Sequence, residues 1–320
     1  MRVAVVGLGT IGLRHLDTLG TLPGVEVAAA ADPRVRSDEV SVPLFRSYEA
    51  MLDAVPVDAV VLCTPSWLHG EQGVLAADRG IHVISEKPLA ITLAGADEVV
   101  DACRRNGVRL AVLHQYRFHA PVVALKRAID EGALGSIVFV NIAFFWRRDR
   151  EYYAKDGGWR GTWRGDGGGA LMNQGSHAVD LARWLGGPIA TVMTATANVR
   201  FPIEAEDTVG VTVRFAEGGL GAIQVTTCAS RNHPAIVQVQ GTEGSATISG
   251  DVLTFDGDPP IDLGPTTAPH RTQFLEIFRA FGDGEAPPVA GVDARTTLAD
   301  TLAMYESAHN GVAVDCARSE

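Results

Sequence analysis

Short apolar runs alternate with helix-like stretches over roughly the first 115 residues of the chain. The expected strands are Val3–Val6, Val25–Ala31, Ala59–Cys63, Ile81–Ile84 and Arg109–Leu113. The expected helices between them are Ile11–Leu19, Leu68–Arg79 and Ala94–Asn106. A continuous apolar run such as Ala59–Cys63 is typical of a parallel strand that is buried on both faces. The alternation therefore predicts an α/β domain, with helices on both faces of a parallel sheet.

The pattern changes after Phe118. Val209–Phe215 alternates in places between apolar and polar positions, as an antiparallel strand with one covered face does. The other expected elements are helices at Pro121–Glu131, Ala170–Leu185, 271–282 and 293–310, a strand at Ile137–Phe145, further β-rich runs within 189–255, and a long loop at Asp256–Pro269. The chain is thus expected to form two domains, residues 1–118 and an α+β domain of residues 119–320.

Composition narrows the class of protein. The chain has 320 residues and a formal net charge of −11, which argues against a general nucleic-acid binder. No apolar run approaches the roughly 18 residues of a membrane span, and no signal peptide is recognisable. The cysteines are widely spaced and form no C-x-x-C pair, which fits reduced thiols in a cytoplasmic protein. We therefore expect neither a membrane nor a nucleic acid as a partner.

The first expected strand is followed by Gly7-Leu8-Gly9-Thr10-Ile11-Gly12, which matches G-x-G-x-x-G. The pattern opens a helix, and Asp32 follows twenty residues after Gly12, so the context required of a dinucleotide-binding loop is present. Gly7 permits the tight turn, Gly9 lets the backbone approach a pyrophosphate, and Gly12 allows close packing of helix and strand. Asp32 would bind the adenosine ribose and repel a 2′-phosphate. NAD is therefore expected rather than NADP, although Arg34 and Arg36 lie nearby.

Lys87 follows the expected strand Ile81–Ile84, within Ser85-Glu86-Lys87-Pro88-Leu89. A side chain at the carboxyl end of a parallel strand points toward the crevice where such sheets bind ligands. Pro88 fixes the turn, and the bond before it is a candidate for the cis form. Lys87 is accordingly a candidate acid or base, with a surface lysine as the alternative.

Several segments, taken in order, resemble the Gfo/Idh/MocA oxidoreductases, the family of glucose–fructose oxidoreductase and inositol dehydrogenase. They are Gly7–Gly12, Cys63–His69, Glu86-Lys87-Pro88, Tyr116-Arg117-Phe118, Gly167–Asp180 and Tyr305-Glu306-Ser307-Ala308. Together they span nearly the whole chain.

The resemblance implies an N-terminal Rossmann domain and a C-terminal α+β domain with an open, mainly antiparallel sheet. That sheet often forms an oligomer interface in the family, so a homodimer or homotetramer is expected. The resemblance also implies hydride transfer between nicotinamide and a sugar or polyol, with Lys87 and His177 as the catalytic pair. Thr64, Pro65 and His69 match the loop that lines the cofactor, and Glu86 matches a position near the nicotinamide ribose.

Asn173, His177 and Asp180 are spaced i, i+4 and i+7, which places them on one face of the expected helix. Many relatives in the resembled family have an aspartate where this chain has Asn173. Asparagine can bind a substrate hydroxyl or orient His177, but it accepts no proton. Asp180 either orients His177 or is a structural acceptor under the helix. No third ligand accompanies His177 and Asp180, so no metal site is expected.

Residues 144–164 are rich in aromatic and basic side chains, including Trp163 and Arg164. Aromatic faces suit sugar C–H surfaces, and arginine suits carboxylate or phosphate. The segment precedes the helix of His177, so it is expected to wall the substrate site together with Arg117. The alternative is a loop whose tryptophans pack on the core and whose arginines are solvated.

The sequence thus predicts an NAD-dependent dehydrogenase acting on a sugar, a polyol or a nucleotide-linked sugar. One alternative is an enzyme that retains NAD and uses transient oxidation for glycoside hydrolysis or internal oxidoreduction. Another is a non-catalytic, NAD-binding regulatory protein.

Overall fold

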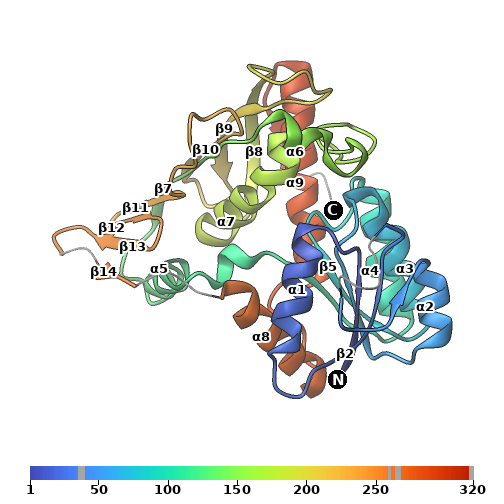
Figure 1. Ribbon diagram of the computed structural model, residues 1–320. Helices are drawn as coiled ribbons and strands as arrows, with labels where there is room; N and C mark the ends of the chain where they lie inside the picture. Colours follow the sequence, from blue (N-terminus) through green and yellow to red (C-terminus); the bar gives the residue numbers. More distant parts are fainter. Residues whose placement is uncertain (35–39, 259–260, 264–267, 317–320) are drawn as a thin grey trace. The chain divides into compact units, whose positions relative to one another are not determined.

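The computed structural model describes residues 1–34, 40–258, 261–263 and 268–316 (Figure 1). The chain forms two compact units. The first contains Met1–Gln115 and Ala268–Arg295, and the second contains Tyr116–Thr267 and Thr296–Glu320. The sequence predicts a division after residue 118, and the two units first divide between Gln115 and Tyr116. It does not anticipate that residues 268–295 return to the first unit.

The first unit is built on a parallel sheet that has six strands among the described residues, in the order β3-β2-β1-β4-β5-β6. This is the order of a dinucleotide-binding Rossmann sheet, with its switch point between β1 and β4. The strands are β1 (Arg2–Val6), β2 (Glu26–Ala31), β3 (Leu44–Phe45), β4 (Ala59–Leu62), β5 (His82–Glu86) and β6 (Leu110–Leu113). All residues of β4 and β6 are buried, because helices cover both faces.

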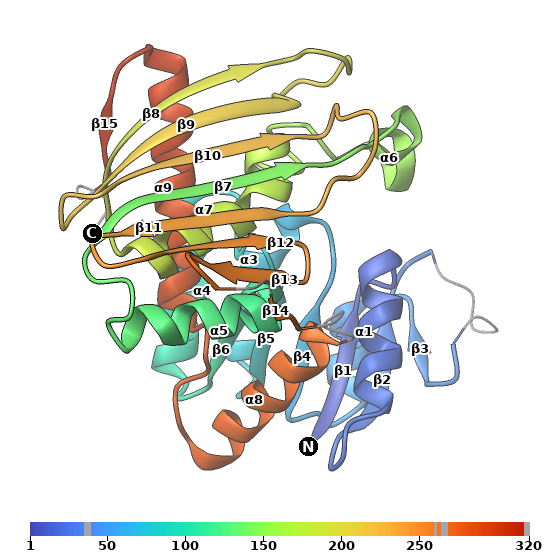
Figure 2. The same ribbon diagram turned by 90° about the vertical axis from the view of Figure 1, so that its left-hand side faces the viewer.

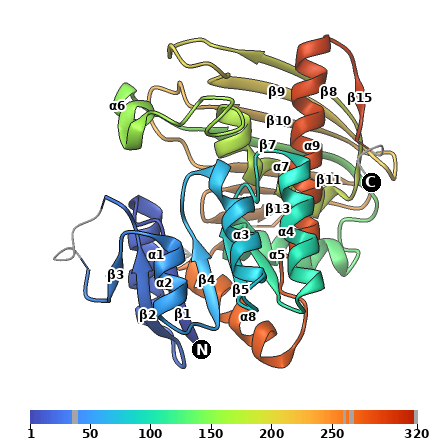
Figure 3. The same cartoon turned by 90° about the vertical axis from the view of Figure 1, so that its right-hand side faces the viewer.

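Two groups of helices cover this sheet. Helices α1 (Thr10–Gly20) and α8 (Pro269–Asp283) lie on one face, and α2 (Tyr48–Ala54), α3 (His69–Ala77) and α4 (Leu93–Arg105) lie on the other (Figures 1 and 3). Phe274, Ile277 and Phe281 of α8 belong to the same buried core as Val3 and Val5 of β1. This apolar face explains why α8, although distant in sequence, completes the first unit.

The second unit contains a sheet that has nine strands among the described residues, in the order β14-β13-β12-β11-β7-β10-β9-β8-β15. Its strands are β7 (Ile137–Phe145), β8 (Ile189–Ala197), β9 (Thr208–Phe215), β10 (Leu220–Thr226), β11 (Ile236–Gly241), β12 (Ser245–Ser249), β13 (Val252–Phe255), β14 (Ile261–Asp262) and β15 (Val314–Asp315). The described pairs are antiparallel except β7 with β10. The expectation of an open, mainly antiparallel sheet is confirmed.

Helices cover one face of this sheet, and no described helix of the unit lies over the other (Figure 2). The covering helices are α5 (Ala120–Asp130), α7 (Ser176–Gly186) and the part of α9 (Gly291–Asn310) that belongs to this unit. Side chains alternate accordingly along β9, where Val209, Val211 and Val213 are buried and the residues between them are exposed. The short helix α6 (Arg150–Ala154) precedes α7 in the chain.

The expected elements match the observed ones to within about two residues at most ends. The helix expected at Ala170–Leu185 begins as a π-helical segment, Leu171–Gly175, before α7. The expectation missed β3, α2 and α6, which are short. The loop expected at Asp256–Pro269 includes the short strand β14 and lies partly outside the described residues, as does Arg36. Across the described residues, no helix is long and apolar enough to cross a membrane.

Candidate functional site

The glycine-rich loop joins β1 to α1 and leaves the start of the helix open. Gly7 has a φ of +86°, and a Cβ there would lie 2.8 Å from the backbone of Cys63 and Thr64. A Cβ on Gly12 would lie 1.9 Å from the carbonyl oxygen of Gly7, so only glycine allows this approach. A Cβ on Gly9, by contrast, would meet no described atom within 4 Å. The loop therefore has free space beside the N-terminus of α1, where backbone N–H groups favour an anion.

Asp32 fixes this loop to the end of β2. Its Oδ2 accepts a hydrogen bond from the backbone N–H of Leu8 at 2.8 Å, and its Oδ1 accepts one from the N–H of Arg34 at 2.7 Å. The side chain is 5% exposed. A carboxylate oxygen has more than one acceptor position, so these bonds leave Asp32 able to accept ribose hydroxyls as well. Gly9, the start of α1 and Asp32 together fit an adenine dinucleotide.

Thr64, Pro65 and His69 follow β4 at the carboxyl edge of the same sheet. The ring of His69 is buried, with Nδ1 lying 2.7 Å from the carbonyl oxygen of Pro88 and Nε2 lying 2.8 Å from that of Thr64. Burial lowers the pKa of His69, while both carbonyls favour its protonated ring. His69 thus ties the loop after β4 to the Lys87-Pro88 turn, and the Lys87–Pro88 peptide bond is cis, as the sequence suggested.

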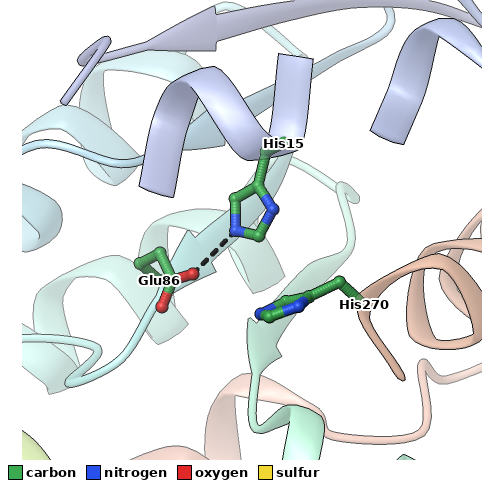
Figure 4. Close-up of side chains that lie close together, drawn as sticks. All are labelled: His15, Glu86 and His270. Carbon is green, nitrogen blue, oxygen red and sulfur yellow. Dashed lines mark hydrogen bonds and ion pairs between the residues drawn. The ribbon is translucent and has the colours of Figure 1, made fainter. Parts of the chain in front are cut away.

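Glu86 ends β5, and the rings of His15 from α1 and His270 from α8 lie close to it (Figure 4). Nε2 of His15 is 2.7 Å from Oε1 of Glu86. Burial raises the pKa of Glu86, but the hydrogen bond and charge of His15 and the charges of His270 and Lys87 outweigh it and bring the pKa to about 2. Glu86 is therefore a carboxylate at neutral pH, immediately before Lys87.

In the second unit, a polar clamp holds the helical segment that carries the remaining candidate residues. The hydroxyl of Tyr305 accepts hydrogen bonds from the N–H groups of Gly169 and Met172, both at 3.1 Å, and donates to Oε1 of Glu206 at 3.0 Å. Glu206 also accepts the N–H of Leu171 at its side chain and that of Ala170 at its carbonyl. The first N–H groups of a helix lack partners within it, so this clamp satisfies four in a row.

The glycines before the helix make room for the clamp. A Cβ on Gly168 would lie 2.1 Å from the Tyr305 hydroxyl, and one on Gly169 would lie 1.9 Å from the carbonyl oxygen of Glu206. Burial raises the pKa of Glu206 to about 7, the bonds from Leu171 and Tyr305 offsetting part of that effect. From the sequence, these glycines were recognisable only as part of the segment Gly167–Asp180, and no role was predicted for Glu206.

Asn173 lies on the π-helical segment and is bound by an aspartate. Its Nδ2 donates to both carboxylate oxygens of Asp166, each at 3.0 Å, and Asp166 is 1% exposed. Next to it, Nε2 of Gln174 donates to the Tyr152 hydroxyl at 2.8 Å. Asn173 stands where many relatives in the resembled family have an aspartate, and the carboxylate of Asp166 lies directly beside it.

His177 follows on α7 and is 5% exposed. Its ring lies against that of Tyr116, with centroids 5.0 Å apart. Asn173 and His177 are separated by four positions on one continuous helical segment, which confirms that they share a helix.

Asp180, for which the sequence left two roles open, pairs with an arginine. Nε and Nη2 of Arg117 donate to its two carboxylate oxygens at 2.8 and 2.6 Å, and both side chains are largely buried. The guanidinium of Arg117 also lies over the ring of Trp184, 5.3 Å from its centroid. The expected assignment of Arg117 and Asp180 to substrate binding stays a prediction. They form an internal ion pair that fixes α7, in agreement with the structural alternative for Asp180.

In residues 144–164, some aromatic side chains pack on the core and others are exposed beside basic side chains. Trp146 stacks on Phe144, with centroids 4.9 Å apart, and belongs to the edge of the core. Arg148 and Arg160 each lie 5.1 Å from the centroid of Tyr152, the tyrosine that Gln174 contacts. Trp163 and Arg164 are exposed, and Trp163 lies edge-on to Tyr305 at 5.1 Å. Cations and aromatic rings thus gather around the segment that carries Asn173.

The sequence interpretation did not include four residues of these arrangements: His15, Asp166, Glu206 and His270. Asp166 lies seven positions before Asn173, so its polarity beside a glycine-rich segment was an available signal. The others reach their partners from distant elements, for example Tyr305 and Glu206 at a separation of 99 residues.

Comparison with protein families agrees with this picture. Residues 1–114 match the model described as "Oxidoreductase family, NAD-binding Rossmann fold", and residues 122–247 match the "GFO/IDH/MocA C-terminal domain".

Individual proteins are similar over almost their full length. The D-xylose 1-dehydrogenase (NADP(+)) 2 of Haloferax volcanii is 30% identical, with 96% of this chain and 98% of that protein covered. The D-apiose dehydrogenase of Paraburkholderia graminis is 28% identical over 98% of this chain and 88% of its own length. Among solved structures, the WlbA dehydrogenase of Bordetella pertussis in complex with NADH and UDP-GlcNAcA is 31% identical, with a TM-score of 0.90 and coverage of 98% and 97%.

Proposed function

Because the chain belongs to the GFO/IDH/MocA family of NAD-binding oxidoreductases, we propose that it is a dehydrogenase acting on a hydroxyl-bearing carbon of a nucleotide-linked sugar. The observation that carries the redox assignment is the open helix start beside Gly9, with Asp32 at the end of the next strand. Lys87 and His177 match the usual catalytic residues of the family, and we assign the acid–base roles to them.

The substrate class follows from the charge around Asn173. Arg148 and Arg160 lie on the ring of Tyr152, and Arg164 is exposed nearby in sequence. Guanidinium groups bind carboxylate or phosphate in two-pronged geometry, which a neutral polyol does not need. The 31% identical WlbA dehydrogenase holds UDP-GlcNAcA in its structure, which supports a nucleotide-linked sugar over a free sugar or polyol.

The proposed roles divide between the two units. Gly9 and the first N–H groups of α1 would bind the pyrophosphate of NAD, and Asp32 would bind the adenosine ribose and disfavour NADP. NAD supplies the acceptor for the hydride that leaves the substrate carbon. Lys87 or His177 takes the proton from the substrate hydroxyl as the carbonyl forms, so that one hydride and one proton leave the alcohol.

Asn173 would orient the sugar rather than accept a proton. The amide nitrogen of Asn173 donates to both carboxylate oxygens of Asp166, and its amide oxygen accepts a hydrogen bond from Gln174 at 3.2 Å. Positioning of the reacting carbon is therefore the contribution we assign to this pair.

The test is to follow the absorbance of reduced nicotinamide while offering UDP-linked sugars, sugar acids, free aldoses and inositols. The proposal expects turnover with a UDP-linked sugar, and a Lys87→Ala variant that still binds NAD but turns over at least 10²-fold more slowly. Arg104→Ala, which removes an exposed cation paired with Asp101 in the same unit as Lys87, is the control.

Two outcomes would favour the alternatives. Bound NAD after purification and product without net NADH would indicate an enzyme that retains its cofactor. NAD binding without turnover of any substrate class, in wild type and Lys87→Ala alike, would indicate a regulatory protein.

We also propose that the protein is a homodimer or homotetramer formed through the helix-free face of the second sheet. Phe145, Met193 and Leu220 are exposed on that face, beside an amide ladder of Asn141, Gln224 and Gln238. A Leu220→Glu substitution is expected to lower the mass measured by light scattering. We place the protein in the cytoplasm, since Cys63, Cys103, Cys228 and Cys316 are free thiols.

A further inference from the structure

Three metal-ligating side chains from three separate elements meet inside the first unit. His15 comes from α1, Glu86 from the end of β5 and His270 from the first turn of α8 (Figure 4). One ligand atom from each lies within 4.8 Å of the other two. His15 is fully buried and Glu86 is 7% exposed, so this is an interior cluster rather than a group of surface charges.

Two members of the cluster are already in contact, because Nε2 of His15 lies 2.7 Å from Oε1 of Glu86. The rings of His15 and His270 also lie close, with centroids 4.9 Å apart.

The donor set matches a particular class of cation. Two imidazoles and one carboxylate are the three protein ligands of many zinc sites, in which water occupies the fourth position. Calcium and magnesium prefer oxygen ligands alone, so a site with two nitrogens selects against them.

The geometry requires only a small adjustment. Ligands at about 2.0–2.2 Å from a tetrahedral metal ion lie farther apart than the 2.7 Å between His15 and Glu86. An ion would therefore separate these two atoms slightly and draw His270 inward. We propose that His15, Glu86 and His270 bind one divalent transition-metal ion of the zinc class, although the sequence alone predicted no metal site.

Such an ion would join α1, β5 and α8, three elements that meet only through folding. Because the unfolded chain has no preformed site, binding of the ion stabilises the folded state. The proposal goes beyond the dehydrogenase activity and does not depend on it.

The experiment is direct metal binding to the full chain. Protein treated with a chelator and freed of it is titrated with Zn²⁺ by calorimetry, and with Co²⁺ while the visible absorption is followed. One ion per chain, a Co²⁺ spectrum of tetrahedral type without a thiolate band, and a Tm that rises with Zn²⁺ concentration are expected. Binding should weaken at pH 5.5, because protonated imidazoles do not bind metal.

Variants locate the site. His270→Ala and Glu86→Gln are each expected to weaken Zn²⁺ binding at least tenfold, whereas His309→Ala removes an exposed histidine and should leave it unchanged. Circular dichroism verifies that the variants fold. The proposal is overturned if the wild-type chain takes up no Zn²⁺, or if folded His270→Ala and Glu86→Gln proteins bind it as tightly as wild type. NAD binding and turnover are measured separately, and His270→Ala is the variant that tests the metal site without changing an expected cofactor residue.

Discussion

Asn173 and Asp166 form a two-pronged contact in which one amide group donates to both oxygens of a buried carboxylate. The contact explains how this chain accommodates asparagine where the resembled family often has aspartate. The carboxylate is here provided by the neighbouring Asp166, and the amide of Asn173 donates to both of its oxygens at 3.0 Å.

We expect Asn173→Asp to be destabilising in a pH-dependent way. Two carboxyl groups about 3 Å apart cannot both ionise, so the pKa of one would rise above its ordinary value. A carboxyl with a raised folded-state pKa costs stability as pH rises, so the loss should be small at pH 4 and reach roughly 2–3 kcal/mol at pH 8. Urea unfolding of the variant across this range measures it.

The exchanged double variant is the control for this pair. Asp166→Asn combined with Asn173→Asp restores one amide and one carboxylate, and should recover most of the lost stability. If Asn173→Asp alone has the unfolding free energy of the wild type at every pH, the contact between Asn173 and Asp166 does not stabilise the fold.

The clamp around Glu206 gives a second prediction. Tyr305→Phe removes the hydroxyl that accepts two backbone N–H groups and donates to Glu206. Buried donors left without an acceptor cost about 1–3 kcal/mol. The helix that follows carries His177, so kcat should fall as well. Tyr153→Phe removes a hydroxyl bonded to Thr227 in the same unit and serves as the comparison. Equal kcat in the two variants would argue that the clamp only adds stability.

Glu206 itself predicts a dependence of stability on pH. Its pKa is raised to about 7 from 4.5 because the carboxyl is buried. Its protonated form is favoured in the fold, so its contribution is fully present below pH 4.5 and is lost as pH rises toward 7. A shift of this size corresponds to about 3 kcal/mol. Glu206→Gln should remove that dependence, seen as a flatter curve of unfolding free energy between pH 5 and 8. If the unfolding free energy of Glu206→Gln depends on pH as that of the wild type does, another group causes the pH dependence.

How much the sequence could predict depends on the range of the contacts. Gly7, Gly9, Gly12 and Asp32 were recognisable because the strand, turn and helix that they serve are adjacent in the chain. The pairing of Asp32 with the N–H of Leu8 follows from the same local unit. Alternating and continuous apolar runs likewise gave both sheets.

The contacts around Asn173 and His177 in the second unit were not predictable in this way. Glu206 reaches this helix from the loop before β9 and Tyr305 reaches it from α9, and nothing local in the sequence ties them to it. His270 is similar, because α8 rejoins the first unit after the whole of the second sheet. The ion pair between Asp180 and Arg117 joins residues 63 positions apart, so it too depends on packing.

Substitutions at two glycines of the nucleotide loop test packing and ligand binding separately. Gly12→Ala would drive a Cβ to 1.9 Å from a backbone oxygen, and we expect a loss of about 3 kcal/mol or more. Gly9→Ala meets no described atom within 4 Å, so the folded protein should lose no more than about 1 kcal/mol. Its methyl group would instead occupy the space that a pyrophosphate needs. Calorimetric titration with NAD should therefore show affinity at least tenfold weaker in Gly9→Ala, at nearly unchanged Tm. Full affinity in that variant would mean that the dinucleotide does not approach the start of α1.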